Sequence, residues 1–348
     1  MRIARVWLIT PSVLVGLVAV AGLGRYAATT RVGSTSAAVH IAPANDVSCF
    51  DTSPHKTIFV TVDPDVHLEV LDWGGAGDPL VLLTGSGDNA HVFDEFAYQF
   101  TDRFRVIGIT RRGFGRSSQP AAGYDVDTRA RDDIAVLDKL NIPRAVFVGH
   151  SIAGTELSKL AAVYPDRVKK LVYLDALDIG SGGWAKLPQP PGAPEITATD
   201  LESVQRLAAE SARDDGYRKP LAAICNMVRM DASGRILGPI TPPEISRKLL
   251  AGLQPAAYDR IEARALGVFN DISTQFRMPY YWALTSAKQV EFNRSIDALS
   301  KWNEGAIRRF RSELKGSYVV ELPNTNHYVF IVEEALVVRE MRKFLLGR

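Results

Sequence analysis

The chain has 348 residues, which is enough for one large domain or two small ones with a sizeable buried core. Lys and Arg number 41 and Asp and Glu 39, a formal net charge of +2, so the composition predicts neither a nucleic-acid surface nor an acidic partner. The six histidines are scattered and no CxxC or HExxH spacing occurs. We therefore expect no metal site and no cofactor.

Residues 1–24 have the layout of an export signal. Arg2 and Arg5 precede an uncharged apolar stretch over residues 6–23, and Ala19-Val20-Ala21 offers a small-residue cleavage site. A retained membrane anchor is the main alternative, because a spanning helix needs about 20 apolar residues. Both interpretations place the rest of the chain outside the cytoplasm, in the periplasm or secreted, with a membrane contacted only through such an anchor.

Residues 25–56 are rich in Ser, Thr and Ala and show no periodicity, so they are predicted to be a linker. The chain has only two cysteines, Cys49 near the end of this linker and Cys225 far beyond it. In an exported protein such a pair favours one disulfide. The alternative is two buried, unpaired thiols.

From residue 57 onward, short apolar runs alternate with amphipathic stretches. Continuous apolar strands separated by helices predict a mostly parallel sheet covered by helices on both faces, which is an α/β fold. The expected strands are 57–62, 67–71, 80–84, 104–109, 145–148, 168–174, 263–269 and 317–322, and the expected helices are 91–100, 126–140, 152–164, 286–315 and 333–346.

The alternation is interrupted after the sixth strand. Residues 186–194 are rich in proline, and helical patterns follow from about residue 200, over 217–230 and from about 242. Thr199 with Glu202, and Thr241 with Glu244, stand in capping-box positions for the first and third of these helices. We expect an all-helical cap over 180–260, inserted between core segments 57–179 and 261–348.

Ser151 stands where the buried strand 145–148 gives way to a helical pattern. Gly149 lies two residues before it and Ala153 two residues after, close to the pattern G-x-S-x-G. At a sharp strand-to-helix turn the flanking residues must be small, and the corner side chain is held at the carboxyl edge of the sheet. The sequence predicts this turn, a nucleophile elbow, at Ser151. The alternative is a serine that caps a helix.

A serine nucleophile needs two backbone N–H groups to bind the oxyanion. The residue after the nucleophile, Ile152, would supply one of them, and Ser86, in the loop after the strand 80–84, would supply the other.

Three segments together resemble the α/β-hydrolase superfamily: residues 106–118, the elbow Gly149-His-Ser-Ile-Ala153, and Leu322-Pro-Asn-Thr-Asn-His327. The resemblance covers about residues 57–348 and is strongest to exported bacterial serine hydrolases that carry GHSIAG. It implies a Ser-His-acid triad with His327 as the base. The acid would follow one of two strands, which leaves Asp175 as the first candidate and Asp271 as the second. The family's R-G-x-G turn at residues 112–115 is interpreted as structural.

The substrate is predicted less firmly than the triad. Trp184, Met227, Tyr281 and Trp282 could wall an apolar pocket for a small hydrophobic ester, or they could simply pack the cap on the core. We expect a serine hydrolase, by default a carboxylesterase. The alternatives are an amidase, a C–C hydrolase, a cofactor-free peroxidase on the same triad, or a ligand-binding hydrolase fold with little turnover. The oligomeric state stays open.

Overall fold

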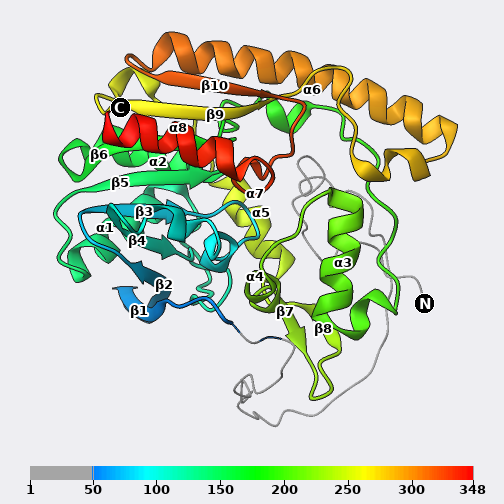
Figure 1. The fold of residues 1–348 in the computed structure, drawn as a ribbon, viewed down its shortest axis with the longest axis horizontal. Helices are drawn as coiled ribbons and strands as arrows, with labels where there is room; N and C mark the ends of the chain where they lie inside the picture. Colours follow the sequence, from blue (N-terminus) through cyan, green and yellow to red (C-terminus); the bar gives the residue numbers. More distant parts are fainter. Residues whose placement is uncertain (1–48, 50, 348) are drawn as a thin grey trace.

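The computed structural model describes residue 49 and residues 51–347. An eight-stranded sheet forms the centre of the described chain, in the order β1-β2-β4-β3-β5-β6-β9-β10 (Figure 1). Strand β2 pairs antiparallel with β1 and β4, and all the other neighbours are parallel. The strands are β1 (Lys56–Asp63), β2 (Val66–Gly74), β3 (Asp78–Leu83), β4 (Phe104–Ile109), β5 (Ala145–His150), β6 (Val168–Leu174), β9 (Ala265–Asp271) and β10 (Tyr318–Pro323).

The central strands are apolar because both of their faces are covered. Residues 145–150 of β5 are buried throughout, as are the last four residues of β3, β4 and β6. A strand buried on both faces loses the alternation of polar and apolar residues and reads as a continuous apolar run. The predicted α/β fold with a mostly parallel sheet is therefore confirmed.

Two helical layers sandwich the sheet. On one face of the sheet, a single apolar cluster contains residues of α1 (Val126–Lys139), α2 (Ala153–Val163) and the C-terminal end of α6 (Ser286–Glu313). The short helices η3 (Ala90–Phe93) and η4 (Ala97–Phe100), with α7 (Val329–Val332) and α8 (Glu334–Leu346), share a second cluster on the other face. The predicted helix over 91–100 is thus two 3-10 turns rather than one α-helix.

The insertion between β6 and β9 lies beside the sheet, where α3, α4, β7 and β8 are grouped in Figure 1. The expectation that it is all helical was wrong, because β7 (Val228–Met230) and β8 (Ile236–Pro239) form an antiparallel hairpin. The predicted helix over 217–230 is reduced to α4 (Leu221–Cys225). Val228 and Ile236 are buried in the cap's own small apolar cluster, which explains why this stretch looked amphipathic.

The cap helices also begin later than the capping-box patterns predicted. Helix α3 (Val204–Asp215) starts after Ser203, whose hydroxyl accepts a hydrogen bond from the Arg206 amide, and Thr199 does not cap it. Helix α5 (Pro243–Ala251) has Pro242 at its N-cap, while the hydroxyl of Thr241 donates to the carbonyl of Gly113 in the core. Neither threonine side chain caps a helix, although helical turns do begin close to the predicted positions, at η7 (Asp200–Glu202) and at α5.

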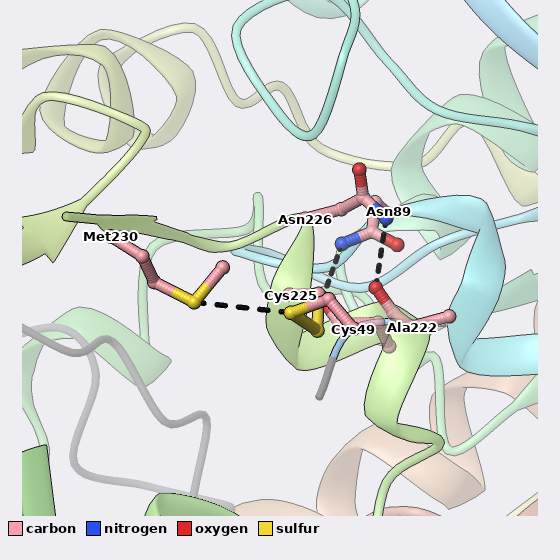
Figure 2. Close-up of a disulfide and its surroundings, with 7 residues drawn as sticks. Cys49, Asn89, Ala222, Cys225, Asn226 and Met230 are labelled. Carbon is pink, nitrogen blue, oxygen red and sulfur yellow. Dashed lines mark hydrogen bonds between the residues drawn. A yellow bond between two sulfur atoms is a disulfide. The ribbon is translucent and has the colours of Figure 1, made fainter. Parts of the chain in front are cut away.

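A disulfide joins Cys49 to Cys225 in α4, with 5.8 Å between their Cα atoms (Figure 2). Two residues before Cys225, the carbonyl of Ala223 accepts a hydrogen bond from Asn89 of the core at 2.9 Å. The predicted signal or anchor, residues 1–24, lies outside the described residues, as does nearly all of the predicted linker. Within the described part of the chain, no helix is long and apolar enough to cross a membrane.

Candidate active site

Ser151 occupies the corner between β5 and α2. Its φ is +57°, a left-handed conformation that is costly for a residue with a side chain. Its amide donates to the carbonyl of Leu174 on the neighbouring strand β6 at 3.2 Å. A Cβ atom at Gly149 would lie 2.9 Å from Leu157 of α2, so only glycine lets the helix turn back this closely. The sequence thus places a strained serine at the carboxyl edge of the sheet.

Asp175 directly follows β6 and is also in a left-handed conformation, with φ of +43°. Its amide donates to Val268 of β9 at 2.7 Å, and its Oδ1 accepts from the Asn270 amide at 2.9 Å. The second carboxylate oxygen, Oδ2, lies 2.5 Å from Nδ1 of His327, which comes four residues after the end of β10. A charge-assisted hydrogen bond of this length fixes both the ring and its tautomer.

Asp271, the other acid considered from the sequence, takes a different position. It ends β9, and its backbone carbonyl accepts from the Asn324 amide at 2.9 Å. Burial, with the charges of Glu321 and Glu304, raises the pKa of its carboxyl group. The structure brings Asp175, and not Asp271, to His327.

Of the triad expected from the sequence, the structure shows the hydrogen bond between Asp175 and His327. Within the described residues, the Ser151 hydroxyl makes no hydrogen bond to His327. In free enzymes such catalytic contacts are often long and tighten only in the complex with substrate. The backbone brings Ser151 close to the acid, because the register pairs His150 with Leu174, so that Ser151 and Asp175 are the next residues on the two strands.

His150 lies beside the base but is fully buried. Its Nε2 is 3.1 Å from the backbone carbonyl of His327, and the two imidazole rings are 4.6 Å apart. Burial and then the nearby charge of His327 hold the pKa of His150 well below its usual value. A neutral, buried ring with this contact supports the loop that carries His327.

The loop after β3, with Thr84, Gly85 and Ser86, faces this corner. A Cβ atom at Gly85 would stand 2.8 Å from Nδ1 of His150, so the loop can approach only as glycine. In the part of the chain that the structure describes, the amides of Ser86 and Ile152 donate no hydrogen bond to another protein group. Two unengaged N–H groups are what binding an oxyanion requires.

The side chain of Arg111 binds the backbone of the same loop. Its guanidinium group donates to the carbonyls of Thr84 and Gly85 at 2.6 and 2.7 Å. It also forms a two-point ion pair with Glu156 of α2, at 3.2 Å for each hydrogen bond, and Arg129 binds the same carboxylate. Burial alone would raise the pKa of Glu156, but the two guanidinium charges outweigh burial and lower it. The helix that begins at the serine corner is thus tied through a buried charge to the loop opposite.

A second buried contact joins this loop to the cap. Asp88 receives hydrogen bonds from Lys219 of the cap at 2.6 Å and from the Tyr328 hydroxyl at 2.8 Å. The Lys219 ammonium also stands 4.6 Å from the centre of the Tyr328 ring. Because Tyr328 adjoins His327, one carboxylate connects the cap, the loop after β3 and the segment that carries the histidine.

The four residues predicted to wall a pocket do not share one apolar surface. Met227 packs in the cap's own cluster, whereas Tyr281 is buried 5.1 Å from the ring of Phe292 in a separate cluster along α6. Trp184 is half-buried, and Trp282 is 76% exposed. Packing, the alternative considered from the sequence, accounts for Met227 and Tyr281.

Sequence reasoning missed the residues that support the site. Arg111 stood next to the quoted arginine–glycine turn, whose Arg112 is structural and pairs with Asp132 in two 2.6 Å hydrogen bonds. A charged residue two positions after the apolar strand β4 was the available signal for Arg111. Glu156 was visible only as a carboxylate on the buried face of a helix.

The spacing of the six histidines in the sequence suggested that they lie apart, but two of them meet in the structure. His55 and His91 come together, with 5.2 Å between their ring centres, beside Asp51 and Asp94. The expectation of scattered histidines was therefore wrong for these two. The chain segments that carry them are far apart in sequence and meet only in the fold.

Residues 78–214 match the family model described as alpha/beta hydrolase fold. A putative non-heme haloperoxidase of Mycobacterium phage D29 is 38% identical over 123 residues, which cover 35% of this chain and 43% of the relative. The 2-(acetamidomethylene)succinate hydrolase of Mesorhizobium japonicum is 24% identical over 78% of this chain and 89% of its own length. A crystal structure of E-2-(acetamidomethylene)succinate hydrolase superposes with a TM-score of 0.61 at 20% identity, over 84% of this chain and 99% of the other.

Proposed function

Because this chain has the α/β-hydrolase fold, we propose that it is a serine hydrolase whose nucleophile is Ser151. The observation that carries the proposal is the 2.5 Å hydrogen bond between His327 and Asp175, formed next to a serine whose φ is +57°. A strained serine at a strand-to-helix corner, with an oriented imidazole at the same sheet edge, is the arrangement that nucleophilic acyl transfer requires.

In the proposed mechanism His327 accepts the proton of the Ser151 hydroxyl as its oxygen attacks an acyl carbonyl. Asp175 keeps the second ring nitrogen protonated and stabilises the imidazolium ion that forms. The amides of Ser86 and Ile152 bind the oxyanion, each worth a factor of roughly 10²–10³ in rate. His327 then protonates the leaving group, and a water molecule that it deprotonates releases the acyl group from Ser151.

We propose a small carboxylic ester of hydrophobic character as the substrate class. A second candidate is a C–N bond, because a relative matched over most of its length and the superposed crystal structure are both named as hydrolases of 2-(acetamidomethylene)succinate. The two candidates differ in the leaving group and use the same nucleophile. The described residues offer no single apolar wall that sets the size of the acyl group.

We also propose that the protein works outside the cytoplasm. The disulfide between Cys49 and Cys225 supports this, because stable disulfides form and persist mainly in oxidising compartments. The apolar stretch of residues 6–23 behind two arginines supports it independently.

The test is hydrolysis of p-nitrophenyl esters from acetate to decanoate, compared with the corresponding p-nitroanilides. The full-length protein and its Ser151→Ala variant are assayed side by side. We expect an initial burst of p-nitrophenolate in the native protein and a loss of turnover of at least about 10⁴-fold in the variant. Faster turnover of anilides than of esters would move the substrate to amides.

Ser151-independent turnover, or none on either series, would refute the proposed chemistry. Circular dichroism and the thermal unfolding midpoint of Ser151→Ala check that the variant is folded. Ser151→Ala should not stabilise the protein by relieving backbone strain, because alanine is as disfavoured as serine at the positive φ of this position.

A further inference from the structure

Four side chains from two separate segments converge near the start of the described chain. Asp51 and His55 lie four residues apart directly after the Cys49 disulfide, and His91 and Asp94 lie at η3, just after the loop that faces Ser151. One ligand atom from each residue lies within 4.8 Å of all the others. None of these residues takes part in the proposed mechanism.

The contacts alternate between carboxylate and imidazole. Asp51 Oδ2 is 2.7 Å from His55 Nε2 and 3.4 Å from His91 Nδ1. Asp94 Oδ2 is 3.1 Å from His91 Nδ1, and Asp94 Oδ1 is 3.9 Å from His55 Nε2. Ligand atoms around a tetrahedral Zn²⁺ at its usual bond lengths lie about 3.3–3.6 Å apart. The four contacts, at 2.7–3.9 Å, bracket this spacing, and with all four atoms within 4.8 Å of one another, side-chain movements of about 1 Å would complete such a shell.

Hydrogen bonds alone satisfy this ring poorly. His91 Nδ1 faces an oxygen of Asp51 and an oxygen of Asp94 at once, and one ring nitrogen carries at most one proton. The two carboxylates are thereby brought close to each other in a site where the side chains of His55, His91 and Asp94 are at most 5% exposed. A single central cation would contact all four groups and remove this repulsion.

Groups around the cluster orient it further. Asp51 Oδ1 accepts from the Ser53 amide at 2.9 Å, and Asp94 Oδ1 accepts from the Trp73 indole N–H at 3.2 Å. Asp51 therefore has one oxygen held by an N–H donor while the other lies near both histidines, and Asp94 has its free oxygen on His91. Behind His91, its Nε2 lies 3.8 Å from Oε1 of the fully buried Glu69, an oxygen with no hydrogen-bond partner among the described residues. A carboxylate behind a ligating histidine is the usual outer shell of a zinc site.

From this juxtaposition we propose that Asp51, His55, His91 and Asp94 form a binding site for one structural Zn²⁺ ion. Two imidazoles and two carboxylates suit Zn²⁺, whereas Ca²⁺ and Mg²⁺ prefer oxygen ligands alone. When both histidines are neutral, as ligation of a metal requires, the two aspartates leave a charge of −2, which a divalent cation cancels. Four protein ligands leave no open position, as in structural rather than catalytic zinc sites. The ion would fasten the segment after Cys49 to η3.

The test uses the full-length protein without a histidine tag, stripped of metal by dialysis against a chelator. Titration with Co²⁺ should produce the intense visible absorption bands of a four-coordinate site, saturating at one equivalent. Zn²⁺ should then displace the cobalt and abolish the bands. Because the ion binds the folded state, Zn²⁺ should also raise the thermal unfolding midpoint, and chelator should reverse the effect.

Matched variants make the test specific. His55→Gln and Asp94→Asn should each weaken Zn²⁺ binding at least about 100-fold, because loss of a ligand costs more than loss of an outer-shell partner. His67→Gln is the control, since His67 is exposed and contacts only Thr61 through its ring. The control and Ser151→Ala should bind Zn²⁺ like the native protein, which separates this site from the proposed hydrolase chemistry.

Two results would overturn the proposal. One is a natively folded full-length protein that shows no four-coordinate Co²⁺ spectrum and no Zn²⁺-dependent stabilisation. The other is stoichiometric binding that persists unchanged in both ligand variants. If a variant does not fold, the Co²⁺ spectrum of the native protein decides on its own.

Discussion

The carboxyl edge of the sheet and the cap are held in place by different means. At the edge, Ser151 and Asp175 follow neighbouring strands, and strand register places them before any side chain acts. The cap is attached mainly through side chains, among them the Lys219–Asp88 ion pair, the hydrogen bonds from Asn89 and from Thr241, and the packing of Ile245 and Leu249 on Phe114 and Tyr124. The disulfide adds a covalent link to the segment before β1. Strand register rests on the backbone and tolerates side-chain changes, whereas the attachment of the cap depends on the side chains that make it.

This difference leads to an ordered set of expectations. Changes to the reacting groups at the sheet edge should reduce the rate greatly without unfolding the protein. Changes to the buried charges beneath the edge, and to the links of the cap, should reduce the free energy of unfolding by several kcal/mol. Titration of one buried histidine should have the smallest effect.

The largest expected effect is on the acid. Asp175→Asn should lower kcat/KM for the best ester by about 10⁴-fold, because the amide stabilises the wrong imidazole tautomer. Asp271→Asn is the matched control and should stay within a few-fold of the native protein. Steady-state kinetics at pH 7.5 measures both. A large loss in Asp271→Asn with little loss in Asp175→Asn would show that the acid has been misassigned.

Beneath the edge, Arg111→Met should lower the free energy of unfolding by about 3–5 kcal/mol. It removes one partner of a buried ion pair and leaves two carbonyls of the loop after β3 without their donor. Urea titration followed by circular dichroism measures the change. Arg308→Met is the control, because Arg308 is exposed and pairs with the equally exposed Glu304. Equal losses in the two variants would remove the special role of Arg111.

In the cap, the double variant Cys49→Ser with Cys225→Ser should lower the free energy of unfolding by about 2–5 kcal/mol. We expect kcat/KM to change less than 10-fold, because register and not the disulfide positions the reacting groups. Unfolding and ester turnover are measured on the same preparation. A loss of activity comparable to that of Asp175→Asn would contradict the distinction between the two regions.

The smallest expected effect is a loss of stability at low pH. Because the pKa of His150 is depressed in the folded state, the unfolded chain binds the additional proton, and stability falls as the pH drops below about 6.5. The loss from His150 is at most about 2 kcal/mol at pH 5, the limit set by protonation of the unfolded chain alone. His150→Gln should remove this contribution, which a comparison of unfolding free energies at pH 7.5 and pH 5 measures. A variant whose pH dependence matches that of the native protein would show that His150 does not titrate as described.

The same contrast explains what the sequence could predict. Strands β4 and β6 were predicted to the residue, because strands buried on both faces read as unbroken apolar runs. The proposed roles of Ser151 and His327 came from short motifs at the ends of predicted strands. In the cap, Val228 and Ile236 pack in a hairpin that has too few residues to show a period of two, so it was read as a helix.

Contacts between distant segments could be predicted only where residue chemistry singled out the partners, as for the only two cysteines, Cys49 and Cys225. Arg111 and Glu156 are 45 residues apart, and no local sequence pattern predicts that they pair. Both candidate acids stand at the end of an apolar strand, so the strand pattern does not choose between them. The structure shows that Asp175 is the one that contacts His327. His55 and His91 likewise looked unrelated until the segment after Cys49 was placed against η3.

The most direct test of the central claim is covalent labelling of the full-length protein with a fluorophosphonate, followed by intact mass measurement and peptide mapping. If Ser151 is activated by His327 and Asp175, one adduct forms, it maps to Ser151, and it forms at least about 10³-fold more slowly in His327→Ala. The native protein and Asp271→Asn should label at the same rate. No adduct on the native protein, or an adduct elsewhere that persists in Ser151→Ala, would contradict the account.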